Sequence, residues 1–308
     1  MGHAFSHRHL LDIERLSAGD IEAVLNLAKR YFEQNRRKKK TDRLKGRTVV
    51  NLFFEPSTRT RTSFEIATKR LGGDVINVLI EQTSTKKGET LLDMVQAFDA
   101  MGIDALVIRH GEDAVPQFIA PQIKACVVNA GDGKHEHPTQ ALLDAFTMLR
   151  HKKSLKNLTV AICGDVQHSR VARSNAWLLT KFGAKVRFVA PPYFMPKNFG
   201  NLGVEACSTM KDGLKDADVV MMLRIQHERL GEGEFAMSLK EYHRDFGLDH
   251  IKIKLAKPDA IVMHPGPVNR DVEISSELAD DPKYSVIREQ VEGGVAVRMA
   301  VLDLLINR

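Results

Sequence analysis

The segment from residue 53 to residue 62 reads Phe53-Phe54-Glu55-Pro56-Ser57-Thr58-Arg59-Thr60-Arg61-Thr62. It begins at the end of an apolar run, 48–54, which has the length and composition of a buried strand. The residues after Pro56 predict a helix over 57–71, and the glycine pair 72–73 ends it. A strand that runs through a tight turn straight into a helix is half of a βαβ unit, so this stretch predicts an α/β fold.

The same alternation of strand and helix continues along the chain. We expect strands at 48–54, 74–80, 105–109 and 125–129 in the first half, and at 158–163, 185–190, 218–223 and 260–264 in the second. Helices are expected at 18–34, 57–71, 90–101, 115–121, 137–149, 170–182 and 295–306. The pattern predicts two mainly parallel sheets, each flanked by helices.

A chain of 308 residues is long enough for two domains. The polar stretch 151–157 separates the two halves, which predicts a first domain over 1–150 and a second over 151–290. The remaining segment, 291–308, contains a helix with apolar residues on one face, and we expect that helix to pack back on the first domain.

Composition narrows the class of protein. Hydrophobic residues make up 43% and charged residues 27%, the balance of a soluble globular protein. The net charge of +6 is a mild excess that can attract anionic metabolites. The densest basic run, 36–40, has no aromatic residues interleaved with it, although nucleic-acid binders usually offer stacking platforms. We interpret the run as a solvated helix end and loop, and expect no nucleic-acid partner.

The cysteines and the first residues of the chain indicate where in the cell the protein is located. Cys126, Cys163 and Cys207 are far apart and form no CxxC pair, which argues against a disulfide framework and a structural zinc site. Residues 1–9 contain no apolar secretory segment, and no apolar run approaches the roughly 20 residues that span a bilayer. We therefore expect a cytoplasmic protein without a membrane partner.

The segment 57–61 has the features of an anion site. A helix N-terminus carries unpaired N–H groups and a partial positive charge. Arg59 and Arg61 in the first turn oppose this dipole unless an anion is bound, and arginine binds phosphate in a bidentate manner. The alternative is that Ser57 or Thr58 is an ordinary N-cap, which leaves both arginines unexplained. The segment lacks the glycines of a P-loop, and the glycine pair 72–73 ends a helix instead of beginning one, unlike a dinucleotide fingerprint.

Three segments resemble motifs of the carbamoyltransferase family. The residues Ser57-Thr58-Arg59-Thr60-Arg61 match its STRTR motif, and residues 132–144, DGKHEHPTQALLD, resemble its HPTQ helix start. The residues His264-Pro265-Gly266-Pro267 resemble its third motif. The three segments have the family's order and spacing, and the resemblance covers essentially the whole chain.

Further details resemble the aspartate branch of the family. Ornithine enzymes usually have a cysteine in the third motif, whereas position 265 is proline. The residues Leu223-Arg224-Ile225-Gln226 and the stretch 84–89 resemble the arginine-x-glutamine element and the lysine loop of the aspartate enzymes. An arginine and a lysine suit a dicarboxylate and would repel the ornithine side chain.

The resemblance implies roles in binding carbamoyl phosphate. It assigns the phosphate group to Ser57, Thr58, Arg59, Thr60 and Arg109. It assigns the carbonyl oxygen to three donors, Thr60, Arg109 and His137. This oxygen becomes an oxyanion during the attack. The carbamoyl NH₂ group is assigned to Gln140 and to the backbone of Gly266 and Pro267. The expected catalytic residues are therefore Arg59, Thr60, Arg109 and His137; a histidine that only caps a helix is the alternative for His137.

The resemblance also implies an aspartate site. It assigns the two carboxylates to Lys87, Arg170 and Arg224, with Gln226 in support. The alternatives are Lys86 for Lys87, Arg173 for Arg170, and a surface salt bridge for Arg224. In this family Ser84 and Lys87 serve a neighbouring subunit, so the resemblance implies a homotrimer with shared active sites. The resemblance allows such trimers to assemble further with regulatory chains or dihydroorotase-like chains.

The function that the resemblance implies is transfer of the carbamoyl group of carbamoyl phosphate to the amino group of L-aspartate. The products are N-carbamoyl-L-aspartate and phosphate, an early step of de novo pyrimidine (UMP) biosynthesis. Catalysis would rest on positioning, electrostatic stabilisation and domain closure, with no metal and no cofactor. The alternatives are a carbamoyltransferase for another amino acid and a non-catalytic member that binds phosphate compounds.

Overall fold

The computed structural model describes residues 5–79, 88–225 and 237–308. The chain divides into two units: unit 1 consists of residues 1–146 and 292–308, and unit 2 of residues 147–291. Each unit has its own sheet, and all strand pairs in both sheets are parallel. The predicted α/β class, with two parallel sheets flanked by helices, is confirmed.

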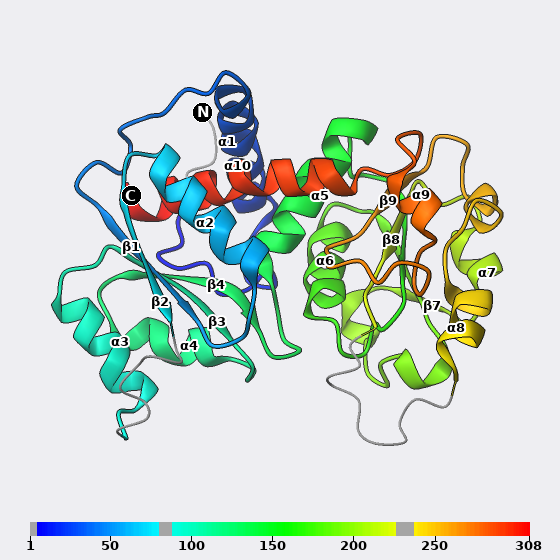
Figure 1. Ribbon diagram of the computed structural model, residues 1–308, viewed down its shortest axis with the longest axis horizontal. Helices are drawn as coiled ribbons and strands as arrows, with labels where there is room; N and C mark the ends of the chain where they lie inside the picture. The colour runs from blue at the N-terminus through cyan, green and yellow to red at the C-terminus, as the bar shows by residue number, and fades with distance from the viewer. Residues whose placement is uncertain (1–4, 80–87, 226–236) are drawn as a thin grey trace. The chain divides into compact units, whose positions relative to one another are not determined.

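Unit 1 contains a four-stranded sheet with the order β2-β1-β3-β4. The strands are β1 (Thr48–Phe53), β2 (Asp74–Leu79), β3 (Ala105–His110) and β4 (Cys126–Asp132). The helices are α1 (Ala18–Arg36), α2 (Thr58–Arg70), α3 (Leu91–Ala100) and α4 (Val115–Ile119), with a 3₁₀ turn at Ala120–Gln122. Helices α3 and α4 lie on one face of the sheet, and α1 and α2 lie on the other (Figure 1).

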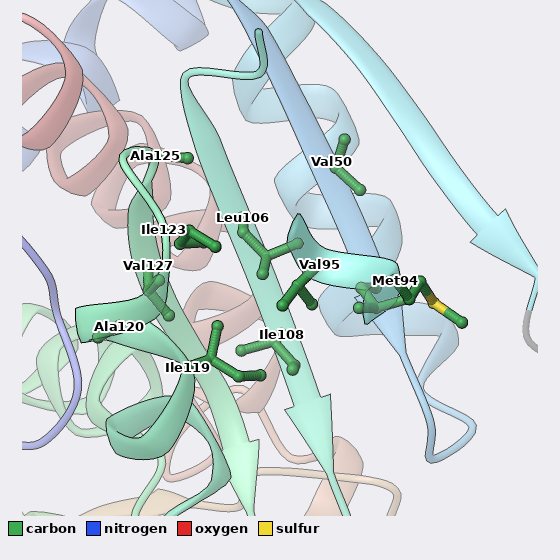
Figure 2. Close-up of a cluster of buried hydrophobic side chains, with 11 residues drawn as sticks. Val50, Met94, Val95, Leu106, Ile108, Ile119, Ala120, Ile123, Ala125 and Val127 are labelled. Atoms are coloured by element: carbon green, nitrogen blue, oxygen red, sulfur yellow. The ribbon is translucent and has the colours of Figure 1, made fainter. Parts of the chain in front are cut away.

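A cluster of buried apolar side chains fills the space between the sheet and helices α3 and α4 (Figure 2). Val50 of β1 and Leu106 and Ile108 of β3 meet Val95 of α3 and Ile119 of α4, and all five side chains are buried. Residues two apart along a strand share a face. The other faces of β1 and β3 are also buried, so these strands read as continuous apolar runs.

Helix α10 (Ile287–Ile306) returns the end of the chain to unit 1. The hydroxyl of Tyr31 donates to Asp303 at 2.6 Å, and Arg43 forms an ion pair with the same carboxylate at 2.9 Å. The helix begins at Ile287, earlier than the predicted 295, and continues through Gly294. A Cβ at that position would lie 2.7 Å from Nη1 of Arg298. Close packing therefore accounts for a glycine inside this helix.

Unit 2 contains a five-stranded sheet with the order β7-β6-β5-β8-β9. The strands are β5 (Thr159–Cys163), β6 (Lys185–Val189), β7 (Glu205–Cys207), β8 (Val219–Met222) and β9 (Ile261–Met263). The helices are α6 (Arg170–Lys181), α7 (Met210–Leu214), α8 (Leu239–Phe246) and α9 (Ser276–Asp280), with 3₁₀ turns at Pro192–Phe194, Gly200–Leu202 and Lys252–Leu255. The short elements β7, α7, α8 and α9 were not predicted, because a few residues carry too little periodicity.

Helix α5 (Pro138–Lys152) contains the division between the units, which falls between Phe146 and Thr147. The polar segment 151–157 begins at the end of this helix. None of the helices in the described parts of the chain is long and apolar enough to cross a membrane.

Candidate active site

The predicted binding residues of unit 1 lie at or just after the carboxyl ends of three neighbouring strands. Ser57 and the start of α2 come after β1, Arg109 lies near the end of β3, and His137 follows β4. Strands β1 and β3 pair so that Phe53 lies opposite Arg109, and the N–H of Phe54 donates to the carbonyl of Arg109 at 2.9 Å. Parallel α/β sheets bind ligands at this edge.

The N-terminus of α2 differs from an ordinary capped helix. Ser57 occupies the N-cap position, but its side chain makes no capping hydrogen bond, and the first turn contains no acidic residue. By contrast, α1, α3 and α8 each begin with a complete capping box. Thr58 and Arg59 are exposed, whereas Thr60 is buried. The Ser57 hydroxyl therefore does not cap the helix as the alternative interpretation requires. The turn offers the donors that an anion needs.

Arg109 is held in place at the edge of the sheet. Its Nε lies 3.1 Å from Oε2 of Glu55, and its Nη1 donates to the carbonyl of Ala130 at 3.3 Å. The side chains of Arg109 and Glu55 are 16% and 24% exposed, so the pair is only partly solvated. A guanidinium oriented in this way can meet an anion with little further ordering.

His137 and Gln140 lie at the start of α5, and both are buried. The carbonyl of His137 accepts the N–H of Gln140 at 2.9 Å, so the residue caps the helix through its backbone. The side-chain NH₂ of Gln140 donates to Oδ1 of Asp144 at 2.9 Å. Because a carboxylate only accepts hydrogen bonds, it pairs with the NH₂ end of the Gln140 amide, and the acceptor Oε1 lies at the other end.

Buried polar residues hold the end of β4 beside this helix start. Asp132 accepts hydrogen bonds from Asn129 at 2.8 Å and from the backbone of Glu136 at 3.0 Å, and it pairs with His135 at 2.9 Å. Burial alone would raise the pKa of Asp132, but the hydrogen bonds from His135 and Asn129 lower it. The hydrogen bond to Asp132 raises the pKa of His135. Apart from the polar composition of 129–136, no sequence signal indicated these contacts.

The predicted aspartate-binding residues of unit 2 also follow neighbouring strands. Arg170 is the first residue of α6 after β5, and Arg224 follows β8, which pairs with β5. Arg170 is buried, whereas the alternative Arg173 is exposed.

Gly164 brings the ends of β5 and β8 close together. Its φ is +126°, and a Cβ would lie 2.7 Å from the carbonyl oxygen of Leu223. Only glycine fits this position. The neighbouring Asp165 is buried and contacts the ring of His168 at 2.8 Å. The segment between β5 and the start of α6 at Arg170 is therefore closely packed.

The third motif follows β9 and is held by a buried pair. Nδ1 of His264 accepts the N–H of Gly266 at 2.8 Å, and Nε2 contacts Oε1 of Glu273 at 3.0 Å. The side chains of His264 and Glu273 are both fully buried. Glu273 also accepts the N–H of Asn269 at 2.6 Å. The sequence analysis did not identify Glu273, because this residue lies outside the motif and contacts it only in the folded structure.

Three predicted residues, Ser84, Lys87 and Gln226, lie outside the described residues. Within the described ranges, no group of three or more His, Cys, Asp or Glu residues could hold a metal ion.

Two family models together match nearly the whole chain. The carbamoyl-phosphate-binding domain of aspartate/ornithine carbamoyltransferases matches residues 8–150, and the aspartate/ornithine-binding domain matches residues 156–305. The chain belongs to the aspartate/ornithine carbamoyltransferase family. The resemblance noted in the three motifs is thereby confirmed.

Relatives within the family point to the aspartate branch. The aspartate carbamoyltransferase catalytic subunit of Rhodospirillum centenum is 59% identical, over 98% of this chain and 95% of the relative. That of Rhodospirillum rubrum is 57% identical, over 98% of this chain and 94% of the relative.

Solved structures of the family share the fold. Aspartate transcarbamoylase from Trypanosoma cruzi, in complex with N-(phosphonacetyl)-L-aspartic acid, has a TM-score of 0.89 at 32% identity, covering 98% of this chain and 97% of that one. Ornithine carbamoyltransferase from Pyrococcus furiosus has a TM-score of 0.87 at 28% identity, covering 99% of both chains. The fold is thus common to both branches, and substrate choice rests on side chains.

Proposed function

We propose that the protein is an aspartate carbamoyltransferase. It transfers the carbamoyl group of carbamoyl phosphate to the amino group of L-aspartate, giving N-carbamoyl-L-aspartate and phosphate. The observation that carries the proposal is the start of α2, where the hydroxyl of Ser57 is not used as a cap and Arg59 and Thr60 occupy the first turn. Support also comes from relatives and solved structures that are named for this activity.

The phosphate group is assigned to the edge of the unit 1 sheet. Ser57, Thr58, Arg59 and Thr60 offer hydroxyls, backbone N–H groups and a guanidinium, and Arg109 adds a second guanidinium. The helix dipole and the cations favour a doubly charged ligand. The ion pair of Arg109 with Glu55 supports this role, because it orients the guanidinium before the ligand arrives.

The carbamoyl group is assigned to side chains that distinguish its two ends. Thr60, Arg109 and His137 donate to the carbonyl oxygen, and Gln140 accepts from the NH₂ group. The orientation of the Gln140 amide supports this assignment, because its own NH₂ group is directed to Asp144. The backbone of Gly266 and Pro267 supplies the remaining acceptors, held by His264.

The aspartate carboxylates are assigned to Arg170 and Arg224, with Lys87 and Gln226 completing the set. The attacking amine nitrogen forms a bond to the carbonyl carbon, and the carbonyl electrons move to oxygen. Collapse of the tetrahedral intermediate breaks the bond to the phosphate oxygen, and the departing phosphate takes a proton from the amine. The protein therefore contributes positioning and oxyanion stabilisation and supplies no covalent nucleophile.

An assay for carbamoyl-aspartate tests the proposal. We expect product only when both carbamoyl phosphate and L-aspartate are present. Ornithine and N-acetylornithine serve as alternative acceptors in the same assay. Binding of carbamoyl phosphate without any product would indicate a non-catalytic member, and faster turnover of ornithine would refute the aspartate assignment.

The proposal extends to assembly and location. We propose a cytoplasmic homotrimer in which Ser84 and Lys87 complete the site of a neighbouring subunit. In this role the enzyme serves an early step of pyrimidine biosynthesis, either alone or joined to regulatory or dihydroorotase-like chains. Lys87→Ala and His137→Ala proteins, each inactive alone, are expected to regain part of the activity when they are dissociated and reassembled together. Absence of any recovery would refute shared sites.

A further inference from the structure

Arg298 is a buried cation next to both helices that carry the proposed carbamoyl phosphate site. It lies on α10 and is 4% exposed. Its guanidinium carbon lies 5.1 Å from the centre of the Phe64 ring on α2, and its Nη1 donates to the carbonyl of Gly294 at 3.2 Å. A Cβ on Gly294 would lie 3.2 Å from Cδ2 of Leu143 on α5, so α10 packs closely against that helix.

Asp144 on α5 is the negative charge that acts on this cation. It is fully buried. Burial lowers the pKa of Arg298 to about 10, and attraction to Asp144 offsets part of that decrease. Arg298 remains a cation at neutral pH, and its attraction to Asp144 also favours the charged form of that carboxylate.

Gln140 lies one turn before Asp144 on the same face of α5. Its NH₂ group donates to Oδ1 of Asp144 at 2.9 Å. An ionised carboxylate accepts only, so it selects one of the two orientations of the amide and excludes the flipped one. This polarity matters, because the carbamoyl NH₂ group needs an acceptor and the flipped amide would present a donor.

We propose that Asp144 and Arg298 are positioning residues that keep the amide of Gln140 turned with its oxygen toward the carbamoyl NH₂ group. The inference rests on the proposed function. Arg298 stabilises the charge of Asp144, Asp144 orients Gln140, and Gln140 distinguishes the NH₂ end of the substrate from its carbonyl end. Neither Asp144 nor Arg298 touches the substrate.

The variant Asp144→Asn tests this chain of contacts with little change in shape. An asparagine can donate as well as accept, so it no longer selects one orientation of Gln140. We expect kcat/KM for carbamoyl phosphate to fall roughly 10- to 100-fold, as for a lost hydrogen bond to an oriented group. Inhibition by inorganic phosphate is expected to change by less than about twofold, because the phosphate group is assigned to residues at the start of α2 and to Arg109, and the Gln140 amide does not contact it.

A second variant removes the risk that a lone buried cation prevents folding. The double variant Asp144→Asn with Arg298→Met leaves no buried charge in this place, and we expect the same kinetic loss with a restored fold. Asp303→Asn is the matched control, because Asp303 is another buried carboxylate of unit 1, paired with Arg43 away from Gln140. We expect it to lower stability and to leave kcat/KM for carbamoyl phosphate near that of the parent protein.

The outcomes separate this inference from the proposed function. A parent protein that forms no carbamoyl-aspartate refutes the proposed function. If the parent is active and the double variant keeps kcat/KM within about twofold, the positioning role is refuted. Equal losses in carbamoyl phosphate and inorganic phosphate affinity would also overturn it, because they indicate a general distortion of α2 and α5.

Discussion

Replacing Glu273 by alanine is expected to destabilise unit 2 and weaken binding of carbamoyl phosphate together. The N–H of Gly266 donates to Nδ1 of His264, so that nitrogen carries no proton and the ring hydrogen is on Nε2. Nε2 then donates to Glu273 at 3.0 Å, and Asn269 donates to the same oxygen at 2.6 Å. Alanine removes both contacts and leaves an imidazole N–H buried without an acceptor.

The structure sets the size of the effect. Hydrogen bonds to a charged acceptor contribute about 1.5–3 kcal/mol each, and Glu273 accepts two of them in a fully buried place. We therefore expect the free energy of unfolding to fall by about 3–5 kcal/mol. Glu273→Gln keeps one acceptor oxygen in place, so its loss is expected to be smaller, about 1–3 kcal/mol.

Urea unfolding followed by the fluorescence of Trp177 measures this change, since the protein has a single tryptophan and it lies on α6 of unit 2. The KM for carbamoyl phosphate is measured in parallel and is expected to rise, because the segment at Gly266 loses its anchor. Asp280→Asn is the control, since it removes an exposed ion pair with Arg270 in the same unit. A loss below about 1 kcal/mol for Glu273→Ala, or one no greater than that of the control, would refute the reasoning.

Other predictions concern the phosphate site, pH and the thiols. Arg59→Ala is expected to lower kcat/KM by at least roughly 100-fold while leaving the fold intact, because the Arg59 side chain is exposed; near-normal activity would contradict the phosphate assignment. The pairing with Asp132 raises the pKa of His135, so its stabilisation is complete below about pH 6.5 and is lost as pH rises through the raised value. The difference in urea midpoint between the parent protein and His135→Asn should therefore shrink from about pH 6 to about pH 9, and a constant difference would contradict the pairing. Burial raises the pKa of Cys126 to about 12 and also raises that of Cys163, so thiol reagents should react with the unfolded protein and leave the activity of the native protein unchanged.

Much of the fold can be predicted from local sequence patterns. The apolar run before Pro56 and the hydroxyl and arginine cluster after it predicted β1 and α2, and the structure places them at 48–53 and 58–70. The alternation of strands and helices predicted parallel sheets, because parallel strands need helical connections. Short elements such as β7 and α9 were missed, since their residues are too few to show a period.

Sequence motifs likewise indicated the residues that follow each strand. Parallel strands bring their carboxyl ends to one edge, so a polar residue after a buried strand is a candidate for that edge wherever its partners lie in the chain. Arg109, Arg170 and Arg224 were found by this argument together with the family resemblance. Arg109 lies near the end of β3, and Arg170 and Arg224 follow β5 and β8, which agrees with it.

The three-dimensional fold was needed to identify the side chains that support these positions. Tyr31 and Asp303 are 272 residues apart and meet at 2.6 Å, and no local pattern predicts such a contact. Arg298 looks in the sequence like any helical arginine, yet the fold buries it beside the ring of Phe64. Local sequence determines backbone preference and hydrophobic period, whereas burial and polarity depend on contacts between residues that are distant along the chain. The class of fold and the binding motifs therefore follow from local sequence, whereas the orientation of the groups within them depends on tertiary contacts.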